Sequence, residues 1–224
     1  MPIDIYMFKV SPPCRAVLMT ALEINVKLNE KLIDPSKGEL LSPDFVKLNP
    51  THAVPAIDDN GFVMWESRAI MQFLCNKYAP DSTLYPKDAK LRAQVDMWLN
   101  MDISLYIKIR QTLVTGYYGM PVKPEDEKQL WANIKLIDQL IGNRQYLVGD
   151  RLTIADLSLL ATSAGTTLLD QDLTEYPHFK QWSDGLAQSL PYYQEINIVA
   201  PEVRQQFINN MKAYMSKMKE MMNK

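Results

Sequence analysis

Apolar and polar residues alternate along the first part of the chain in short runs that predict a strand followed by a helix. Ile3, Ile5 and Met7 recur at every second position, which is the period of a strand with one buried face. Beyond Ser11, the apolar residues between positions 14 and 22 recur three and four residues apart, as in a helix that packs on a sheet. The two prolines after Ser11 suit the first turn of that helix.

The following residues predict the remainder of a small sheet. Residues 26–28 return to period two, residues 55–57 read as a short strand, and Asp59-Asn60-Gly61 forms a hairpin turn before a strand at 62–65. A helix that ends near Tyr78 follows, whereas the stretch before residue 55 is less regular. This order of elements predicts a mixed sheet with one antiparallel hairpin.

A different pattern begins after residue 80. Turn-forming residues fill the stretch to Pro86, and almost everything after Lys87 reads as helix. We therefore expect an α/β domain over residues 1–80, a linker over 81–88 and an all-helical domain over 89–224. Within the last, Thr153 and Asp156 have the spacing of a structural N-cap with an acidic third residue.

Composition narrows the classes of function. The 224 residues are 47% hydrophobic, which is enough for a substantial core, and the net charge of −2 gives no pull towards nucleic acid or anionic membranes. No signal peptide and no long apolar run is evident, so we expect a cytoplasmic protein. The two cysteines are too few for a disulfide framework and lack the spacing of a zinc site, so we expect no metal.

Ser11 is the first candidate for chemistry. It lies between the first strand and the first helix, where backbone N–H groups and the helix dipole favour an anion, so its hydroxyl could hold a thiolate. The alternative is simple helix capping. Cys14 belongs to the apolar stripe of the helix and is interpreted as a core residue.

Two further motifs could bind the ends of a small peptide. In His52-Ala53-Val54-Pro55, a cis proline at a strand start would present the backbone of Val54, and His52 could bind a carboxylate or have only a structural role. In Glu66-Ser67-Arg68, a helix start with both charges suits a zwitterionic amino-acid head, although a cap with a surface ion pair would look the same.

These motifs together resemble the cytosolic glutathione transferases, specifically the insect delta and epsilon classes. The similarity rests on Ser11-Pro-Pro-Cys-Arg, Asn49-Pro-Thr-His-Ala-Val-Pro55, Trp65-Glu-Ser-Arg-Ala-Ile70 and Leu152-Thr-Ile-Ala-Asp-Leu-Ser158, and it runs almost the full length. It implies a thioredoxin-like N-terminal domain that binds glutathione and a helical C-terminal domain that binds an electrophile, in a homodimer that acts in detoxification.

The resemblance also implies a role for each matched residue. Ser11 donates its hydrogen to the glutathione sulfur, and the other residues bind the tripeptide: His52 its glycyl carboxylate, Val54 with Pro55 its cysteinyl backbone, and Glu66, Ser67 and Arg68 its γ-glutamyl end. The residues implied for the electrophile pocket are Pro13, Tyr106, Arg110, Tyr117, Tyr118 and Phe207. A methionine-rich final helix could cover the core or act as a tolerant lid.

Two positions depart from the family pattern. Leu40 stands where delta-class relatives usually have histidine, and Lys9-Val10 replaces the delta-like Pro-Gly before Ser11. The first removes an expected contact to the glycyl end of glutathione, and the second leaves the class between delta and epsilon. Glutathione-dependent peroxidase or isomerase activity, and a carrier of glutathione or hydrophobic ligands with little turnover, are the competing interpretations.

Overall fold

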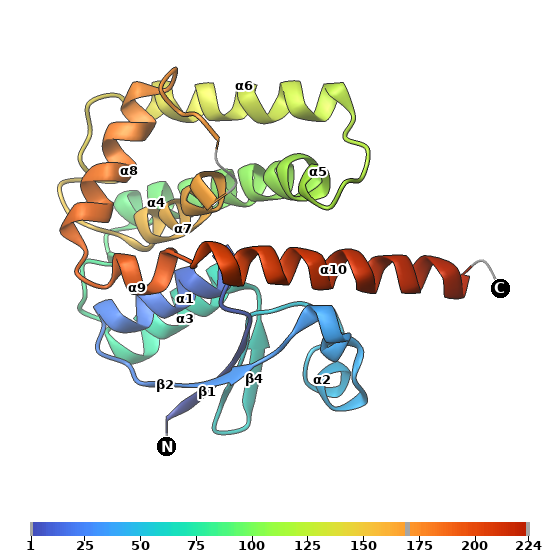
Figure 1. Cartoon of the computed structure of the whole chain (residues 1–224). Helices are drawn as coiled ribbons and strands as arrows, with labels where there is room; N and C mark the ends of the chain where they lie inside the picture. The colour runs from blue at the N-terminus through green and yellow to red at the C-terminus, as the bar shows by residue number, and fades with distance from the viewer. Residues whose placement is uncertain (1, 169–170, 223–224) are drawn as a thin grey trace.

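A computed structural model describes residues 2–168 and 171–222, with the side chains of residues 117, 165–168 and 222 excepted. Its N-terminal part is a four-stranded sheet with helices (Figure 1). The elements in chain order are β1 (Ile3–Met7), α1 (Pro12–Glu23), β2 (Leu28–Leu32), the short 3-10 turns η1 (Pro35–Lys37) and η2 (Glu39–Leu41), α2 (Pro43–Leu48), β3 (Ala56–Asp59), β4 (Phe62–Trp65) and α3 (Ser67–Tyr78).

The sheet has the strand order β2-β1-β3-β4 and is mixed, as the sequence predicts. β1 runs parallel to β2, with Ile3 opposite Leu28, and antiparallel to β3, with Ile5 opposite Ile57. β3 and β4 form an antiparallel hairpin, as predicted. The alternate residues Ile3, Ile5 and Met7 are buried, so the period-two pattern of β1 is the buried face of the sheet.

The remainder of the chain is helical, as predicted. Residues 79–88 contain no helix or strand, and the elements that follow are α4 (Ala89–Ile109), the π-helical segment η3 (Arg110–Val114), α5 (Thr115–Tyr117), α6 (Pro124–Ile141), α7 (Ile154–Leu168), α8 (Pro177–Ser189), α9 (Tyr193–Asn197) and α10 (Pro201–Met222). None of the described helices is long and apolar enough to cross a membrane. The N-terminal part is therefore a thioredoxin-like domain with a small mixed sheet, and the C-terminal part is a helical domain.

The start of α7 is fixed by the predicted pair of polar residues. The buried Asp156 carboxylate accepts hydrogen bonds from the Thr153 backbone N–H at 2.9 Å, the Thr153 hydroxyl at 2.9 Å and the Leu147 N–H at 2.8 Å. The bonds from Thr153 tie the third residue of the helix to its N-cap, and the bond from Leu147 joins the preceding loop to the helix. Asp156 therefore has a structural role.

The two domains meet along α1, whose fully buried Arg15 reaches into the helical domain. Its guanidinium donates to the carbonyl of Asn197 at 3.0 Å and to the carbonyl of Ala161 at 3.4 Å. Burial lowers the pKa of Arg15 to about 10, and its Nε has no hydrogen-bond partner among the described residues. The sequence suggested no such role, because a single arginine on an amphipathic helix is usually solvated.

α10 crosses the molecule between the sheet domain and the upper helices, and its C-terminal end projects beyond them (Figure 1). The ring of Phe207 lies 4.5 Å from that of Phe8, centroid to centroid. Further along, a Cβ atom added to Gly38 would lie 3.3 Å from the ring of Tyr214, and Gly38 has a φ of 74°. The final helix therefore packs on the loop after β1 and on the turn between η1 and η2.

Candidate active site

Ser11 lies at the N-cap position of α1, yet its hydroxyl accepts no hydrogen bond from the first turn of the helix. Its backbone is extended, its N–H donates to the Phe8 carbonyl at 2.9 Å, and its carbonyl accepts from the Arg15 N–H at 3.1 Å. The side chain makes no capping hydrogen bond and is half-buried. Because prolines occupy the first two helical positions, they remove the N–H of residues 12 and 13 as donors. The hydroxyl is thus available for another partner.

Cys14 is a core residue, as predicted. Its side chain is fully buried, and burial raises the pKa of its thiol to about 11, although a hydrogen bond with the Ser11 side chain opposes that rise. The Ser11 hydroxyl therefore lies within reach of a neutral thiol. A hydroxyl carries one donor hydrogen on a free rotor, so the same group can turn towards a stronger, charged acceptor.

The loop before β3 has the geometry predicted for peptide binding. The Val54–Pro55 bond is cis, and Val54 is half-buried beside the exposed His52. The side chain of His52 is 3.3 Å from the carbonyl of Leu40, measured at Nδ1. The buried Asn49 fixes the loop, because its side-chain amide donates to the Ala53 carbonyl at 2.7 Å.

The turn into α3 carries the third motif, but its arginine has a partner the sequence did not reveal. Glu66 is exposed with a φ of 71°, and Ser67 is buried. Arg68 donates from Nε to Asp102 of α4 at 3.1 Å, makes a second hydrogen bond to the same oxygen from Nη2, and donates from Nη1 to the Ser67 hydroxyl at 2.9 Å. Ser158 of α7 also donates to Asp102, at 2.5 Å. The arginine is therefore anchored to the helical domain, not to a surface carboxylate.

A cavity of about 370 Å³ lies between the two domains and contains part of the predicted site. Ser11, His52 and Val54 line it from the thioredoxin-like domain. Pro55, Glu66, Ser67 and Arg68 do not line it. Arg68 lies beside it, because its guanidinium carbon is 5.7 Å from the ring centre of Tyr106, which forms part of the wall.

The helical domain supplies the opposite wall. Four residues predicted for the electrophile line it, namely Tyr106, Arg110, Tyr118 and Phe207. Pro13 is buried and does not line the cavity, whereas the adjacent Pro12 does; the side chain of Tyr117 lies outside the described residues. Burial raises the pKa of the Tyr118 phenol to about 12, and the positive charge of Arg110 opposes this rise.

Comparison with known proteins agrees with this architecture. Residues 5–82 match the family described as "Glutathione S-transferase, N-terminal domain", and residues 96–191 match "Glutathione S-transferase, C-terminal domain". A delta-class glutathione transferase of Nilaparvata lugens is 37% identical, with a TM-score of 0.84 over 95% of this chain and 100% of the other. The chain belongs to the glutathione S-transferase family.

Two other solved structures of glutathione transferases are also similar to this chain. The unclassified glutathione S-transferase 2 of Bombyx mori is 31% identical, with a TM-score of 0.82 over 96% of this chain and 99% of the other. An epsilon-class enzyme of Musca domestica is 28% identical, with a TM-score of 0.81 over 95% and 98%. This protein is thus a glutathione transferase with insect relatives in the delta and epsilon classes, and glutathione is the co-substrate of its family.

Several residues of the candidate site were not predicted from the sequence. Phe8, Arg15 and Arg204 line the cavity, and Asp102 supports Arg68. No local spacing indicates them, because their partners lie in distant parts of the chain. A periodicity signal existed only on α10, where residues 207, 211, 214, 215 and 218 recur at helical spacing and are half-buried on one face.

A second hollow, of about 350 Å³, lies over α8 and α9 between Asp184 and Gln194 and is more open; it carries none of the predicted site residues. Among the described residues, no group of three or more His, Cys, Asp or Glu side chains could hold a metal ion. Of these two hollows, the interdomain cavity is the one that contains predicted site residues.

Proposed function

We propose that this transferase joins the sulfur of glutathione to small hydrophobic electrophiles, in detoxification, and that the Ser11 hydroxyl stabilises the glutathione thiolate. In the simplest case the thiol loses its proton to solvent and the sulfur attacks an activated aromatic carbon. A carbon–sulfur bond forms, the carbon–halogen bond breaks, and halide leaves with the electron pair. The observation that carries the proposal is that Ser11 lines the interdomain cavity and that its hydroxyl makes no capping hydrogen bond.

The energy required is within reach of one hydroxyl. A thiol of pKa about 8.5 is only a few per cent ionised at pH 7, and lowering that pKa by about two units takes about 2.7 kcal/mol. A hydrogen bond to a charged acceptor contributes roughly 1.5–3 kcal/mol. Because no described hydrogen bond links Ser11 to a histidine or a carboxylate, we expect it to act as a donor and not as a nucleophile.

We infer that glutathione lies with its sulfur at Ser11 and its backbone along Val54 and Pro55. The cis bond at this loop and the position of Val54 in the cavity wall support that placement. His52 lies where the glycyl carboxylate would bind. The turn at Glu66, Ser67 and Arg68, next to the cavity, would receive the γ-glutamyl end, and Asp102 would hold the arginine in place.

We further propose that the enzyme is a cytoplasmic homodimer of the delta/epsilon group. Identity of 37% to a delta-class enzyme and 28% to an epsilon-class enzyme supports the group. Large apolar side chains that remain exposed on the monomer, such as Phe62 of β4 and Met97 of α4, support association. Light scattering coupled to gel filtration tests this: a mass of one chain at micromolar concentration would contradict it.

The test of the mechanism is Ser11→Ala, with Ser183→Ala as the matched control. Ser183 is exposed on α8, and its hydroxyl donates to the Lys180 carbonyl at 3.0 Å. We expect kcat/KM with 1-chloro-2,4-dinitrobenzene to fall about ten- to a hundredfold in Ser11→Ala, because one charge-assisted hydrogen bond is lost. The ultraviolet absorbance of bound thiolate should titrate at correspondingly higher pH. Equal rates in the two variants would remove Ser11 from this role.

A further inference from the structure

The last helix, α10, borders the part of the cavity where the glycyl end of glutathione is inferred to bind. Pro35, Leu40 and His52 line that part from the thioredoxin-like domain. Phe207 and Met211 of α10 line the same cavity. Because His52 is the residue inferred for the glycyl carboxylate, α10 adjoins the glutathione site as well as the electrophile pocket.

Two aromatic rings of α10 pack directly on the thioredoxin-like domain. The ring of Phe207 lies 4.5 Å from that of Phe8, centroid to centroid. The ring of Tyr214 lies so near Gly38 that an added Cβ atom would be 3.3 Å from it. That distance is tighter than an ordinary contact, so a methyl group enters between the helix and this turn only if the ring moves.

Met211 lies between these two contacts. Phe207 and Tyr214 are seven residues apart, which is about two helical turns and roughly 10 Å along the axis, so both rings are on one face of α10. Met211 is four residues after the first and three before the second, so it shares that face. All three side chains are half-buried. Residues 207–214, which we call the strap, therefore cover the cavity on the side of His52.

The contacts of the strap point to the peptide and not only to the electrophile. Tyr214 packs on Gly38, in the turn that leads to Leu40. The carbonyl of Leu40 in turn lies 3.3 Å from Nδ1 of His52. The strap thus rests on the same loop that positions the residue inferred for the glycyl carboxylate.

We propose that Met211 and Tyr214 are specificity-determining residues that restrict the third residue of the thiol peptide to glycine. This rests on the proposed transferase function and on the placement of the glycyl carboxylate at His52. Glycine has no side chain, so its α-carbon can lie directly against the strap. A larger third residue adds atoms between His52 and Met211, and the strap must then move away from the thioredoxin-like domain.

The two ring contacts resist that movement. A methionine alone repacks easily, but the rings of Phe207 and Tyr214 hold the helix in place on either side of Met211. Extra volume in a packed site forces side chains out of their preferred rotamers or shifts the backbone. One methyl group should be tolerated better than a branched side chain. The expected order of preference for the third residue is therefore glycine, then alanine, then valine.

Three thiol peptides test the proposal: glutathione, γ-glutamylcysteinylalanine and γ-glutamylcysteinylvaline. All three keep the γ-glutamyl group, the thiol and the terminal carboxylate, and they differ only in the third side chain. For each, kcat/KM for the peptide at a fixed concentration of 1-chloro-2,4-dinitrobenzene is divided by the uncatalysed rate constant, which removes intrinsic reactivity. We expect the wild-type enzyme to favour glutathione over the valine peptide about ten- to a hundredfold, with the alanine peptide between them.

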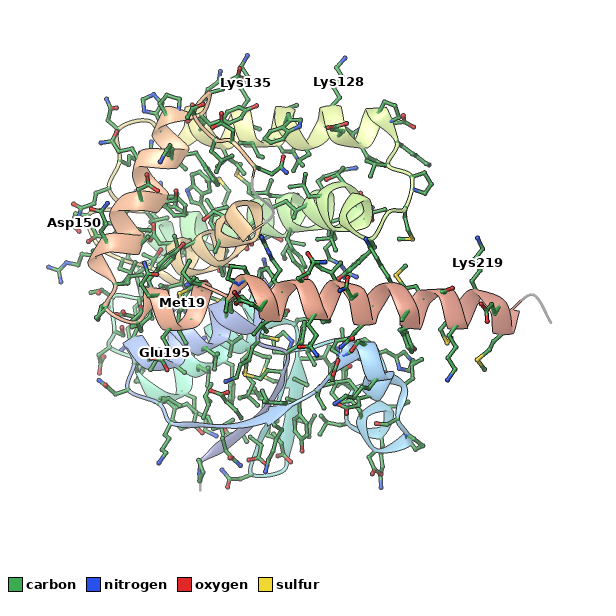
Figure 2. The ribbon with its side chains drawn as sticks, in the orientation of Figure 1. Met19, Lys128, Lys135, Asp150, Glu195 and Lys219 are labelled. Carbon is green, nitrogen blue, oxygen red and sulfur yellow. The ribbon has the colours of Figure 1, made fainter. Side chains whose placement is uncertain are left out.

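Met211→Ala tests the strap, with Met221→Ala as the matched control. Met221 is 62% exposed on the projecting end of α10, near Lys219, which Figure 2 shows pointing away from the thioredoxin-like domain. We expect Met211→Ala to lower the preference for glutathione over the valine peptide about tenfold, mainly by raising the normalised rate of the valine peptide. The control should leave the preference unchanged.

A second pair of variants separates the ring of Tyr214 from its hydroxyl. Tyr214→Phe keeps the ring on Gly38 and should keep the preference for glutathione. Tyr214→Ala removes the ring and should lower the preference, as Met211→Ala does. Circular dichroism confirms that each variant is folded.

The outcomes that contradict the inference differ from those that contradict its basis. Equal normalised rates for the three peptides in the wild-type enzyme reject the restriction to glycine, while the transferase function stands. A preference that is unchanged in Met211→Ala or in Tyr214→Ala removes that residue from the role. Failure of the wild-type enzyme to conjugate glutathione itself with 1-chloro-2,4-dinitrobenzene rejects the proposed function.

Discussion

Replacement of Asp102 by asparagine tests how the two domains are held together at the turn into α3. Asp102 is 1% exposed and accepts from Arg68 twice and from Ser158 once. Asparagine keeps the shape and one acceptor oxygen but removes the charge. The substitution therefore leaves a guanidinium that is only 11% exposed without its counter-charge.

The expected cost follows from that burial. Removal of one partner of a buried ion pair destabilises a protein by roughly 3–5 kcal/mol. Because Arg68 retains its bond to the Ser67 hydroxyl, we expect the lower end, about 3 kcal/mol. For a chain of this size that corresponds to a fall in Tm of roughly 6–12 °C. The KM for glutathione should rise as well, because Arg68 loses the group that positions it.

Urea unfolding at fixed protein concentration, followed by circular dichroism and tryptophan fluorescence, gives the free energy. Asp184→Asn is the control, because that carboxylate is half exposed and pairs with Lys180 on the surface of α8; its loss should cost under about 1 kcal/mol. A double-mutant cycle with Arg68→Gln isolates the pair. The reasoning is refuted if Asp102→Asn is no more destabilising than the control, or if the two substitutions are additive.

Two further predictions concern the backbone and the thiols. Gly38→Ala should destabilise the protein by more than Gly61→Ala. Both glycines have positive φ, but only Gly38 has Tyr214 within 3.4 Å of the added carbon. Unfolding curves and hydrogen exchange in α10 measure this difference, and equal effects would contradict the packing argument. Burial raises the pKa of Cys14 to about 11 and of Cys75 to about 12. At alkaline pH the folded state therefore keeps protons that the unfolded thiols release. The free energy of unfolding should fall as pH rises above about 8.5. Replacing both cysteines with alanine should flatten that decline, and an unchanged slope would assign it to other groups.

The sheet and its helices could be predicted because their signals are local. Period-two apolar residues define β1, and Asp59-Asn60-Gly61 defines the hairpin between β3 and β4. The cis bond before Pro55 was also predicted from its place at a strand start. In contrast, the six-residue α2 lies in a stretch that was interpreted as irregular, because a helix of fewer than two turns shows little periodicity, although Ser42 caps it by accepting from the Phe45 N–H at 3.3 Å.

The supporting parts of the site could not be predicted, for a different reason. Asp102 lies 34 residues from Arg68 and 56 from Ser158, so only the packing of α3, α4 and α7 brings the three together. The π-helical turn at Arg110 has no sequence signature, since it arises from a shift in backbone hydrogen bonding. Arg15 has the pattern of a solvated residue and becomes a buried one only when the helical domain covers α1.

That covering of α1 has a consequence for how the chain is made. Arg15 emerges early from the ribosome, but the two carbonyls that receive its guanidinium belong to Ala161 and Asn197. Until residue 161 is synthesised, the arginine has neither of them, and the apolar face of α1 around it stays uncovered; the second carbonyl follows only at residue 197. The domain that is translated first therefore completes its buried contacts last. An N-terminal fragment that ends before α7 should expose this face and aggregate or recruit chaperones, whereas the full chain closes over it.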